Sequence, residues 1–176
     1  MKYTLLNEQF PFKNGPPRSG GLHLTDITRD MYLTILHGRD NSTDNNLWAE
    51  PGYLWEELLE WAYAKRNPHR IGEITLDGIT GSPDGMDWEN WVLYEDKFTW
   101  RSTKKEPMDD ERWMMQVKGY CKMLGTCKVK MRVFYCMGDY RGSGPQYKVY
   151  ELYFTQREVD EHWEGIVNHA KWKGWL

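Results

Sequence analysis

The sequence has few features that would cross-link a fold or anchor it in a membrane. Three cysteines occur in 176 residues and no two are spaced as Cys-x-x-Cys, which argues against a disulfide framework and a zinc site. No stretch approaches the roughly 20 apolar residues of a membrane span, and the first residues lack the apolar run of a signal peptide. We therefore expect a soluble, cytoplasmic protein without a membrane partner, and one domain over residues 1–176.

An excess of positive charge is also missing. The formal net charge is −3, whereas a nucleic-acid-binding domain is more often basic. Charge is unevenly spread, however, because ten Lys and Arg residues between positions 97 and 132 face four acidic residues in the same span. A local basic face of this kind is compatible with DNA contact, and a solvated surface explains it equally well.

The patterns of apolar, turn and capping residues predict a mixed α/β protein. Residues 1–21 contain six Pro or Gly residues and predict an irregular N-terminal arm. Thr155 and Glu158 have the spacing of a capping box, which predicts the start of the last helix. In chain order we expect a helix that Thr25 caps and that runs toward His37, a helix over 47–66, strands over 71–79 and 91–98, a helix over 110–124, strands over 127–137 and 147–154, and a helix over 156–171. Asp109 or Asp110 can cap the helix over 110–124, and Gly125 ends it.

The stretch from Gly81 to Lys97 organises the chain. Its first half contains turn residues around Asp84, and its second half predicts a strand on which Glu95 and Lys97 share one face while Asp96 points to the other. A hairpin between the halves would bring Asp84 close to Glu95. Two adjacent carboxylates repel each other unless a hard divalent cation lies between them.

Two of the expected helices carry pairs of residues that are four positions apart and therefore lie on one face. Glu56 follows Gly52 by one helical turn. On the same helix we expect Leu54, Leu58 and Trp61 to face the core, in an apolar stripe that Trp55 and Leu59 widen. Gln116 and Tyr120 are four residues apart and share a face of the helix over 110–124. His23 has two readings, a ligand or phosphate contact and a local contact at a helix start, of which the second is favoured.

The order of these motifs resembles the PD-(D/E)xK nuclease superfamily, in its RecB-like and lambda-exonuclease-like branch. The residues that carry the resemblance are Gly52 and Glu56, Pro83-Asp84, Glu95-x-Lys97, and Gln116 with Tyr120. The resemblance covers nearly all of the chain after Gly21. It implies a three-layer, restriction-endonuclease-like α/β fold, with a central mixed sheet of about five strands flanked by helices in an αβββαβ core.

The resemblance also implies a function. It predicts a DNA nuclease that depends on Mg²⁺, with Mn²⁺ as a substitute and without an iron–sulfur cluster, and in particular a stand-alone exonuclease of the phage recombination type. Glu56, Asp84 and Glu95 would be the metal ligands, and Lys97 would orient the attacking water or stabilise charge at phosphorus. The substrate-binding residues would be Gln116, Tyr120, Arg101, Lys104 and Lys105.

Several expectations about partners and alternatives follow. DNA is the expected partner, together with a single-strand annealing or recombination protein, in the host cytoplasm if a phage encodes the chain. A ring-shaped homo-oligomer with a basic lumen would reconcile the charge of −3 with DNA binding. Three alternatives remain open: a structure-specific or restriction-type endonuclease, a catalytically silent DNA-binding or interaction module, and a carbohydrate binder that uses the ten Trp residues.

Overall fold

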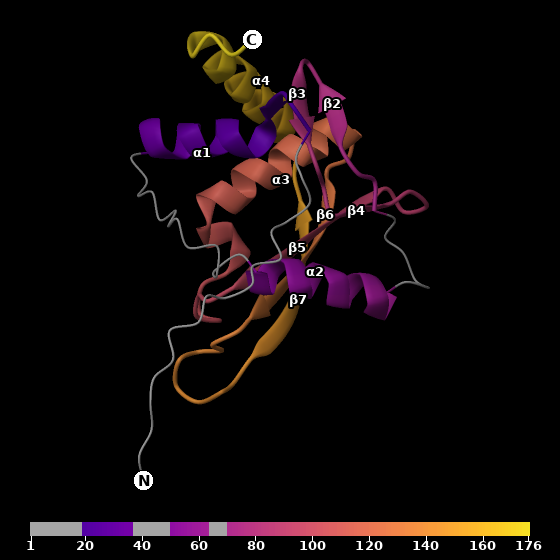
Figure 1. Ribbon diagram of the computed structural model, residues 1–176, viewed down its shortest axis with the longest axis vertical. Helices are drawn as coiled ribbons and strands as arrows, with labels where there is room; N and C mark the ends of the chain where they lie inside the picture. Colours follow the sequence, from indigo (N-terminus) through magenta and orange to yellow (C-terminus); the bar gives the residue numbers. More distant parts are fainter. Residues whose placement is uncertain (1–18, 37–49, 64–69) are drawn as a thin grey trace, which may run out of the picture.

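Two mixed β-sheets organise the part of the chain that the computed structural model describes, residues 19–36, 50–63 and 70–176 (Figure 1). The larger sheet has the order β4-β5-β6-β7, and the smaller sheet has the order β1-β3-β2. The strands of the larger sheet are β4 (Gly85–Asp87), β5 (Val92–Thr99), β6 (Lys128–Tyr135) and β7 (Gln146–Tyr153). Those of the smaller sheet are β1 (Leu22–His23), β2 (Ile74–Leu76) and β3 (Ile79–Gly81).

Strand β5 pairs with a neighbouring strand along the whole of one edge but along only part of the other. On one side it pairs in parallel with β6 along its length, from Leu93 opposite Val129 to Thr99 opposite Tyr135. On the other side, the short antiparallel strand β4 reaches only as far as the pair of Gly85 with Tyr94. Among the described residues, no strand pairs with this edge of β5 beyond Tyr94. The edge from residue 95 onward is therefore open to side chains.

Helices cover both faces of the larger sheet, so the predicted three-layer α/β arrangement is confirmed. On one face lie α3 (Glu111–Leu124), α4 (Gln156–Trp172) and α1 (Leu24–Thr34), which pack on each other and on inward residues such as Met131 and Val133. Helix α2 (Glu50–Tyr63) covers the other face (Figure 1). The ring centroids of its Trp55 and of Phe134 on β6 lie 4.6 Å apart. The strands differ from the expected single central sheet, because they divide between two sheets.

Three helix boundaries follow the predicted capping chemistry closely. The Asp110 carboxylate accepts hydrogen bonds from the backbone N–H groups of Arg112 and Trp113 and so begins α3. Gly125 ends α3 in the left-handed conformation, with φ of 67°. Thr155 and Glu158 form the predicted capping box at the start of α4.

The start of α1 differs from the prediction. His23 is the N-cap, and the helix runs from Leu24 to Thr34 instead of starting after Thr25. Thr25 was wrong as the cap because the parallel pairing of His23 with Thr80 already ends the extended segment there. The expected end at His37 lies outside the described residues, as do residues 1–18 of the N-terminal arm and residues 47–49 and 64–66 of the second helix.

The strand expected over residues 71–79 is also wrong, because a hairpin interrupts it. Asp77 and Gly78 have φ of 51° and 79° and form the two-residue turn between β2 and β3. Asp-Gly is the preferred sequence for such a turn because both central residues need positive φ. The Trp163 indole N–H donates to the Asp77 carboxylate over 2.8 Å, which fastens this turn to α4.

Helix α2 buries only one edge of the apolar stripe that was predicted to face the core. Leu54, Leu58 and Trp61 were expected in the core, but they are 57%, 49% and 78% exposed. The helix instead packs through Trp55 and the buried Leu59. Periodicity marked the apolar positions correctly but could not show which edge of the broad apolar stripe meets the sheet.

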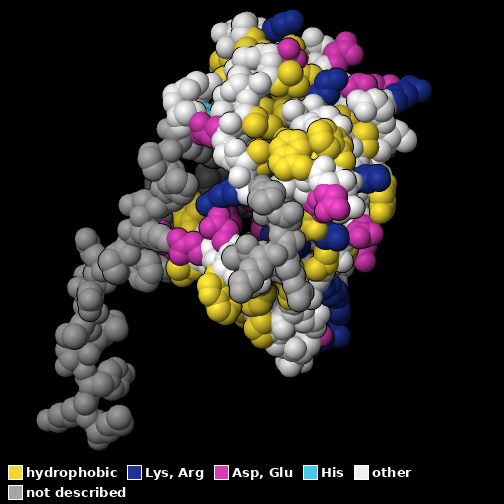
Figure 2. Space-filling model, turned by 90° about the vertical axis from the view of Figure 1, so that its right-hand side faces the viewer, with side chains coloured by type: hydrophobic (Ala, Val, Ile, Leu, Met, Phe, Trp, Pro, Cys, Tyr) yellow, Lys and Arg dark blue, Asp and Glu magenta, His cyan; other side chains and the backbone are white. Residues whose placement is uncertain are grey.

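The described surface is mixed in charge rather than basic. Basic and acidic side chains intermingle around hydrophobic ones on the face in Figure 2. Half of the basic residues between 97 and 132 form ion pairs with carboxylates, namely Lys97, Arg101, Lys122, Lys130 and Arg132. No helix within the described ranges has both the length and the apolar character needed to cross a bilayer.

Candidate active site

A cavity of about 410 Å³ opens at the unpaired edge of β5. Its walls come from the first turn of α1, from α2, from the segment between β3 and β4, from β5 and from α3. The predicted site residues that line it are Glu56, Asp84, Glu95, Lys97, Gln116 and Tyr120. Residues from four separate parts of the sequence therefore meet in one place.

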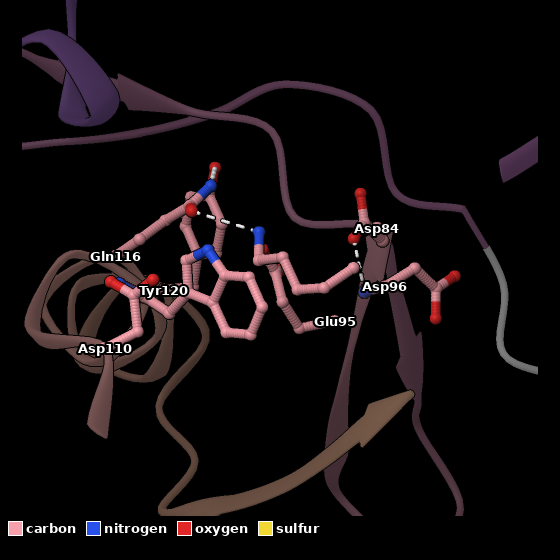
Figure 3. A network of polar contacts seen from close by, with 8 residues as sticks. Asp84, Glu95, Asp96, Asp110, Gln116 and Tyr120 are labelled. Carbon is pink, nitrogen blue, oxygen red and sulfur yellow. Dashed lines mark hydrogen bonds and ion pairs between the residues drawn. The ribbon is translucent and has the colours of Figure 1, made fainter. Parts of the chain in front are cut away.

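Asp84 occupies the position at which another strand would otherwise continue. Its Oδ2 accepts a hydrogen bond of 2.6 Å from the backbone N–H of Asp96, on the open edge of β5 (Figure 3). This is the contact that the predicted hairpin requires, because Gly85 pairs with Tyr94 and the residues next to that pair are Asp84 and Glu95. The Asp96 side chain points away from this group, as its strand position predicts (Figure 3).

Lys97 connects the carboxylate pair to α3. Its Nζ lies 2.5 Å from Glu95 Oε1 and 3.1 Å from Gln116 Oε1, and the Gln116 amide donates to the Tyr120 hydroxyl over 3.1 Å (Figure 3). Glu95 and Lys97 share a face of β5, while Gln116 and Tyr120 share a face of α3. The four polar side chains form one hydrogen-bonded chain across the cavity.

The electrostatics of the cavity disfavour negative charge on its carboxyl groups. Removal from water is the largest cause, and repulsion by Asp84 adds to it at Glu95 and Glu56. Burial raises the pKa of Asp84 to about 6, with repulsion by Asp96 adding to it. The pKa of Glu95 rises to about 8 and that of Glu56 to about 7. Burial works against the charge of Lys97, but Glu95 and Asp84 outweigh it and raise the pKa of Lys97 above its usual range.

Asp84 and Glu95 fit a hard divalent cation. Glu95 is 1% exposed, and its Oε2 is buried without a hydrogen-bond partner among the described residues. An unpartnered carboxylate oxygen beside a second carboxylate is the donor set that Mg²⁺ or Mn²⁺ prefers. No group of three His, Cys, Asp or Glu side chains in the described ranges is arranged to hold a metal, so these two carboxylates are the core of the candidate site.

Glu56 borders the same cavity, but its carboxylate faces a cation of the protein. Arg70 Nη2 lies 3.2 Å from Glu56 Oε2, and the other nitrogen of the same guanidinium lies 2.7 Å from Glu60. Gly52 gives no close approach here, because a Cβ added to it would meet no described atom within 4 Å. The close approach occurs instead at Gly81, where a Cβ would lie 2.8 Å from the Tyr120 ring.

No protein-family model and no curated protein matches the chain. Among solved structures, an alkaline exonuclease from Laribacter hongkongensis is 14% identical, with 86% of each chain covered and a TM-score of 0.56. A phage-related exonuclease from Haemophilus somnus is also 14% identical, with 83% of this chain and 78% of that chain covered and a TM-score of 0.52. The chain shares the fold of these two exonucleases. At these identities the likeness concerns the fold, and the chemistry rests on the residues of the cavity.

Three predicted phosphate-binding residues lie outside the cavity. Arg101 pairs over 2.7 Å with the buried carboxylate of Asp110 and lies over the Trp113 ring. Lys104 and Lys105 are exposed in the connection between β5 and α3 and do not line the cavity. Their nearness in sequence to Lys97 did not translate into nearness to the site, because β5 carries the chain away from it.

Sequence reasoning missed Arg70 and Glu73, which line the cavity. Both stand in the segment after α2, which carries no recognisable motif, so no pattern in the sequence marked them. His23 also lines the cavity, and its Nε2 lies 3.0 Å from the backbone oxygen of Ser19. The favoured reading of His23 as a local contact at a helix start agrees with this bond.

Proposed function

We propose that this protein is a divalent-cation-dependent DNA nuclease and that it acts as an exonuclease. The observation that carries the proposal is the pair of Asp84 and Glu95, with an unpartnered buried oxygen and with Lys97 held 2.5 Å from Glu95. The fold shared with two exonucleases supports it. A further structure of the Laribacter enzyme contains dAMP, and a nucleoside monophosphate is what an exonuclease acting on DNA would release.

Each side chain of the cavity has a role in this proposal. Asp84 and Glu95 would hold Mg²⁺ or Mn²⁺, which when bound supplies an activated water and charge stabilisation at phosphorus. Lys97 would orient that water or stabilise the charge that develops on the phosphate. Gln116 fixes the Lys97 ammonium through its side-chain oxygen, and with Tyr120 it would position the DNA strand. Glu56 would assist the cation directly or through water.

The decisive experiment compares linear DNA with closed circular DNA, each incubated with Mg²⁺, with Mn²⁺ and with a chelator. An exonuclease degrades the linear molecule to mononucleotides or short products, leaves closed circles intact, and stops when the chelator is present. Cleavage of the circles would favour the endonuclease alternative instead. DNA binding without any cleavage would favour a catalytically silent module, and no DNA binding at low ionic strength would favour a carbohydrate binder.

The assembly and partners also belong to the proposal. A ring of identical chains around DNA would place basic surface inside and leave the acidic balance of the chain, with its net charge of −3, outside. A single-strand annealing or recombination protein would then receive the strand that remains. Light scattering of the purified protein tests the ring, and a monomer at working concentration would exclude it.

A further inference from the structure

The cavity is poor in positive charge for a site that takes a polyanion. Two Lys or Arg side chains line it, Lys97 and Arg70, against the acidic residues Glu56, Glu73, Asp84, Glu95 and Asp96. Lys97 is 15% exposed and lies against Glu95, whereas Arg70 is 54% exposed. Arg70 is therefore the accessible guanidinium among the described residues that line the cavity.

The carboxylate partners of Arg70 can be replaced by another anion. Both of its carboxylate partners, Glu56 and Glu60, lie on one side of α2 and are themselves partly exposed. Ion pairs between partly exposed side chains contribute little to stability, so another anion can replace them. A guanidinium presents two parallel N–H donors, which match two phosphate oxygens as well as they match a carboxylate.

The charge of Arg70 also bears on the proposed cation site. It acts on Glu56 and on Asp84 and favours the ionised forms of both carboxyl groups. A guanidinium at this position repels a divalent cation and at the same time occupies Glu56. Cation and Arg70 therefore compete for one carboxylate.

We infer that Arg70 binds a phosphate of the DNA backbone, and that its ion pair with Glu56 keeps it from doing so until a divalent cation binds the Glu56 carboxylate. The inference rests on the proposed nuclease function. In the free protein, Arg70 neutralises Glu56. When the cation is bound, the guanidinium loses this partner and turns to a substrate phosphate at the mouth of the cavity, where the cavity offers no other exposed cationic side chain among its described residues.

This exchange predicts opposite effects on two ligands. Arg70→Gln removes a repulsive charge, so Mn²⁺ should bind about 3- to 10-fold more tightly in the absence of DNA. The same variant loses a phosphate contact, so the affinity for a short duplex in Ca²⁺ should fall about 5- to 30-fold. The slope of log affinity against log salt concentration should become shallower by about 0.9.

The experiment measures Mn²⁺ binding by electron paramagnetic resonance and DNA binding by fluorescence anisotropy, with Arg157→Gln as the matched control. Arg157 is an exposed arginine on α4 that pairs with Glu161 and does not line the cavity. Its variant carries the same charge change and should behave as wild type. Arg70→Lys keeps the charge but loses the paired donors, so it should bind Mn²⁺ as wild type does and DNA with intermediate affinity.

Two results would overturn the inference while the proposed function stands. One is a wild-type protein that binds Mn²⁺ and DNA beside an Arg70→Gln variant whose DNA affinity matches that of Arg157→Gln. The other is an Arg70→Gln variant whose Mn²⁺ affinity is unchanged or weaker. A wild-type protein that binds neither Mn²⁺ nor DNA gives a distinct result, because it overturns the proposed function and the inference together.

Discussion

Arg132 and Asp96 form a two-pronged ion pair on the face of β5 opposite Glu95 and Lys97. Arg132 Nε and Nη2 lie 2.6 and 2.7 Å from the two Asp96 carboxylate oxygens, across the register that pairs β5 with β6. Each side chain is about 6% exposed. The backbone N–H of Asp96 is also the donor that orients Asp84. The pair therefore fixes the peptide that holds a proposed metal ligand.

Arg132→Met should lower the free energy of unfolding by about 3 kcal/mol. The reason is that Asp96 would keep a buried charge without its partner, and broken buried pairs typically cost about 3–5 kcal/mol. Urea denaturation at neutral pH measures the loss. A double variant, Arg132→Met with Asp96→Asn, should recover part of the stability because no unpaired charge remains. If the double variant is less stable than the single variant by a further 3 kcal/mol, the pair does not act as a unit.

Asp84→Asn and Glu95→Gln should each reduce cleavage by at least about 10³-fold while the fold persists. Each change removes one charge from the proposed cation site and keeps the size of the side chain. Because burial already disfavours the Asp84 charge, Asp84→Asn should not lower the free energy of unfolding in chelator. Single-turnover cleavage in Mg²⁺ and urea denaturation in chelator test both parts. Wild-type turnover by either variant would show that the cation is held elsewhere.

The sequence predicted which of these side chains lie close together in the cavity better than it predicted the contacts around them. Strand alternation placed Glu95 and Lys97 on one face, helical spacing placed Gln116 beside Tyr120, and turn chemistry brought Asp84 to the same edge. These rules act over a few residues, so a single sequence contains them. Two ion pairs, of Arg132 with Asp96 and of Arg70 with Glu56, join residues that no local rule connects. The sequence does not show which acidic residue an arginine will pair with.

The exposed face of α2 shows the same limit for apolar residues. Leu54, Leu58 and Trp61 have helical spacing, yet Trp55 and Leu59 make the contact with the sheet. Five apolar residues form a broad stripe on this helix. Helical spacing alone does not show which edge of such a stripe contacts the sheet. The Asp-Gly turn at Asp77 is a different case, because its preferred dipeptide stands in the sequence, yet the alternation of residues over 71–79 led us to expect one continuous strand there.

Arg101→Ala should affect stability more than DNA binding. Arg101 pairs with Asp110, the residue that caps α3, and lies over Trp113. Removal of a partly exposed partner from a buried carboxylate should cost about 1 kcal/mol of unfolding free energy. Urea denaturation and binding of a short duplex in Ca²⁺ measure the two effects separately. Lys104→Ala is the control, since Lys104 is exposed; a loss of DNA affinity for Arg101→Ala larger than tenfold would restore its predicted role as a phosphate contact.

Acid should weaken the contact between α1 and α4 at Asp30. Burial works against the Asp30 charge, but hydrogen bonds from Lys173 and His169 outweigh it and hold the pKa of Asp30 below its ordinary value. A carboxyl group with a lowered pKa in the folded state stabilises the protein above its unfolded pKa, about 4, and loses that effect as the pH falls through the folded pKa. The difference in urea midpoint between wild type and Asp30→Asn should therefore be largest above pH 5 and shrink toward pH 3. A difference that is independent of pH would rule out this ionic contribution.

The final prediction separates the chemical role of Lys97 from substrate binding. Lys97 is held by Glu95 and Gln116, so its ammonium has a fixed position before any substrate arrives. A positioned charge of this kind acts more on the transition state than on the bound ground state, and its removal typically costs about 10²–10³ in rate. Lys97→Ala should therefore lower the single-turnover rate at saturating protein by that factor, while the affinity for DNA in Ca²⁺ changes only a few-fold.

Gln116 tests the same prediction with a smaller expected effect. At saturating protein, where its proposed contact with the DNA strand weighs least, Gln116→Ala leaves the Lys97 charge in place but removes one of the two groups that fix it, so its rate should fall between those of wild type and Lys97→Ala. In a Lys97→Ala background the same change should then cost little more, because the ammonium that Gln116 positions is gone. Lys122→Ala is the matched control, since Lys122 pairs with Asp160 on the far side of α3 and does not line the cavity. Independent, additive losses for Lys97 and Gln116 would mean that Gln116 acts on the DNA directly and not through the ammonium.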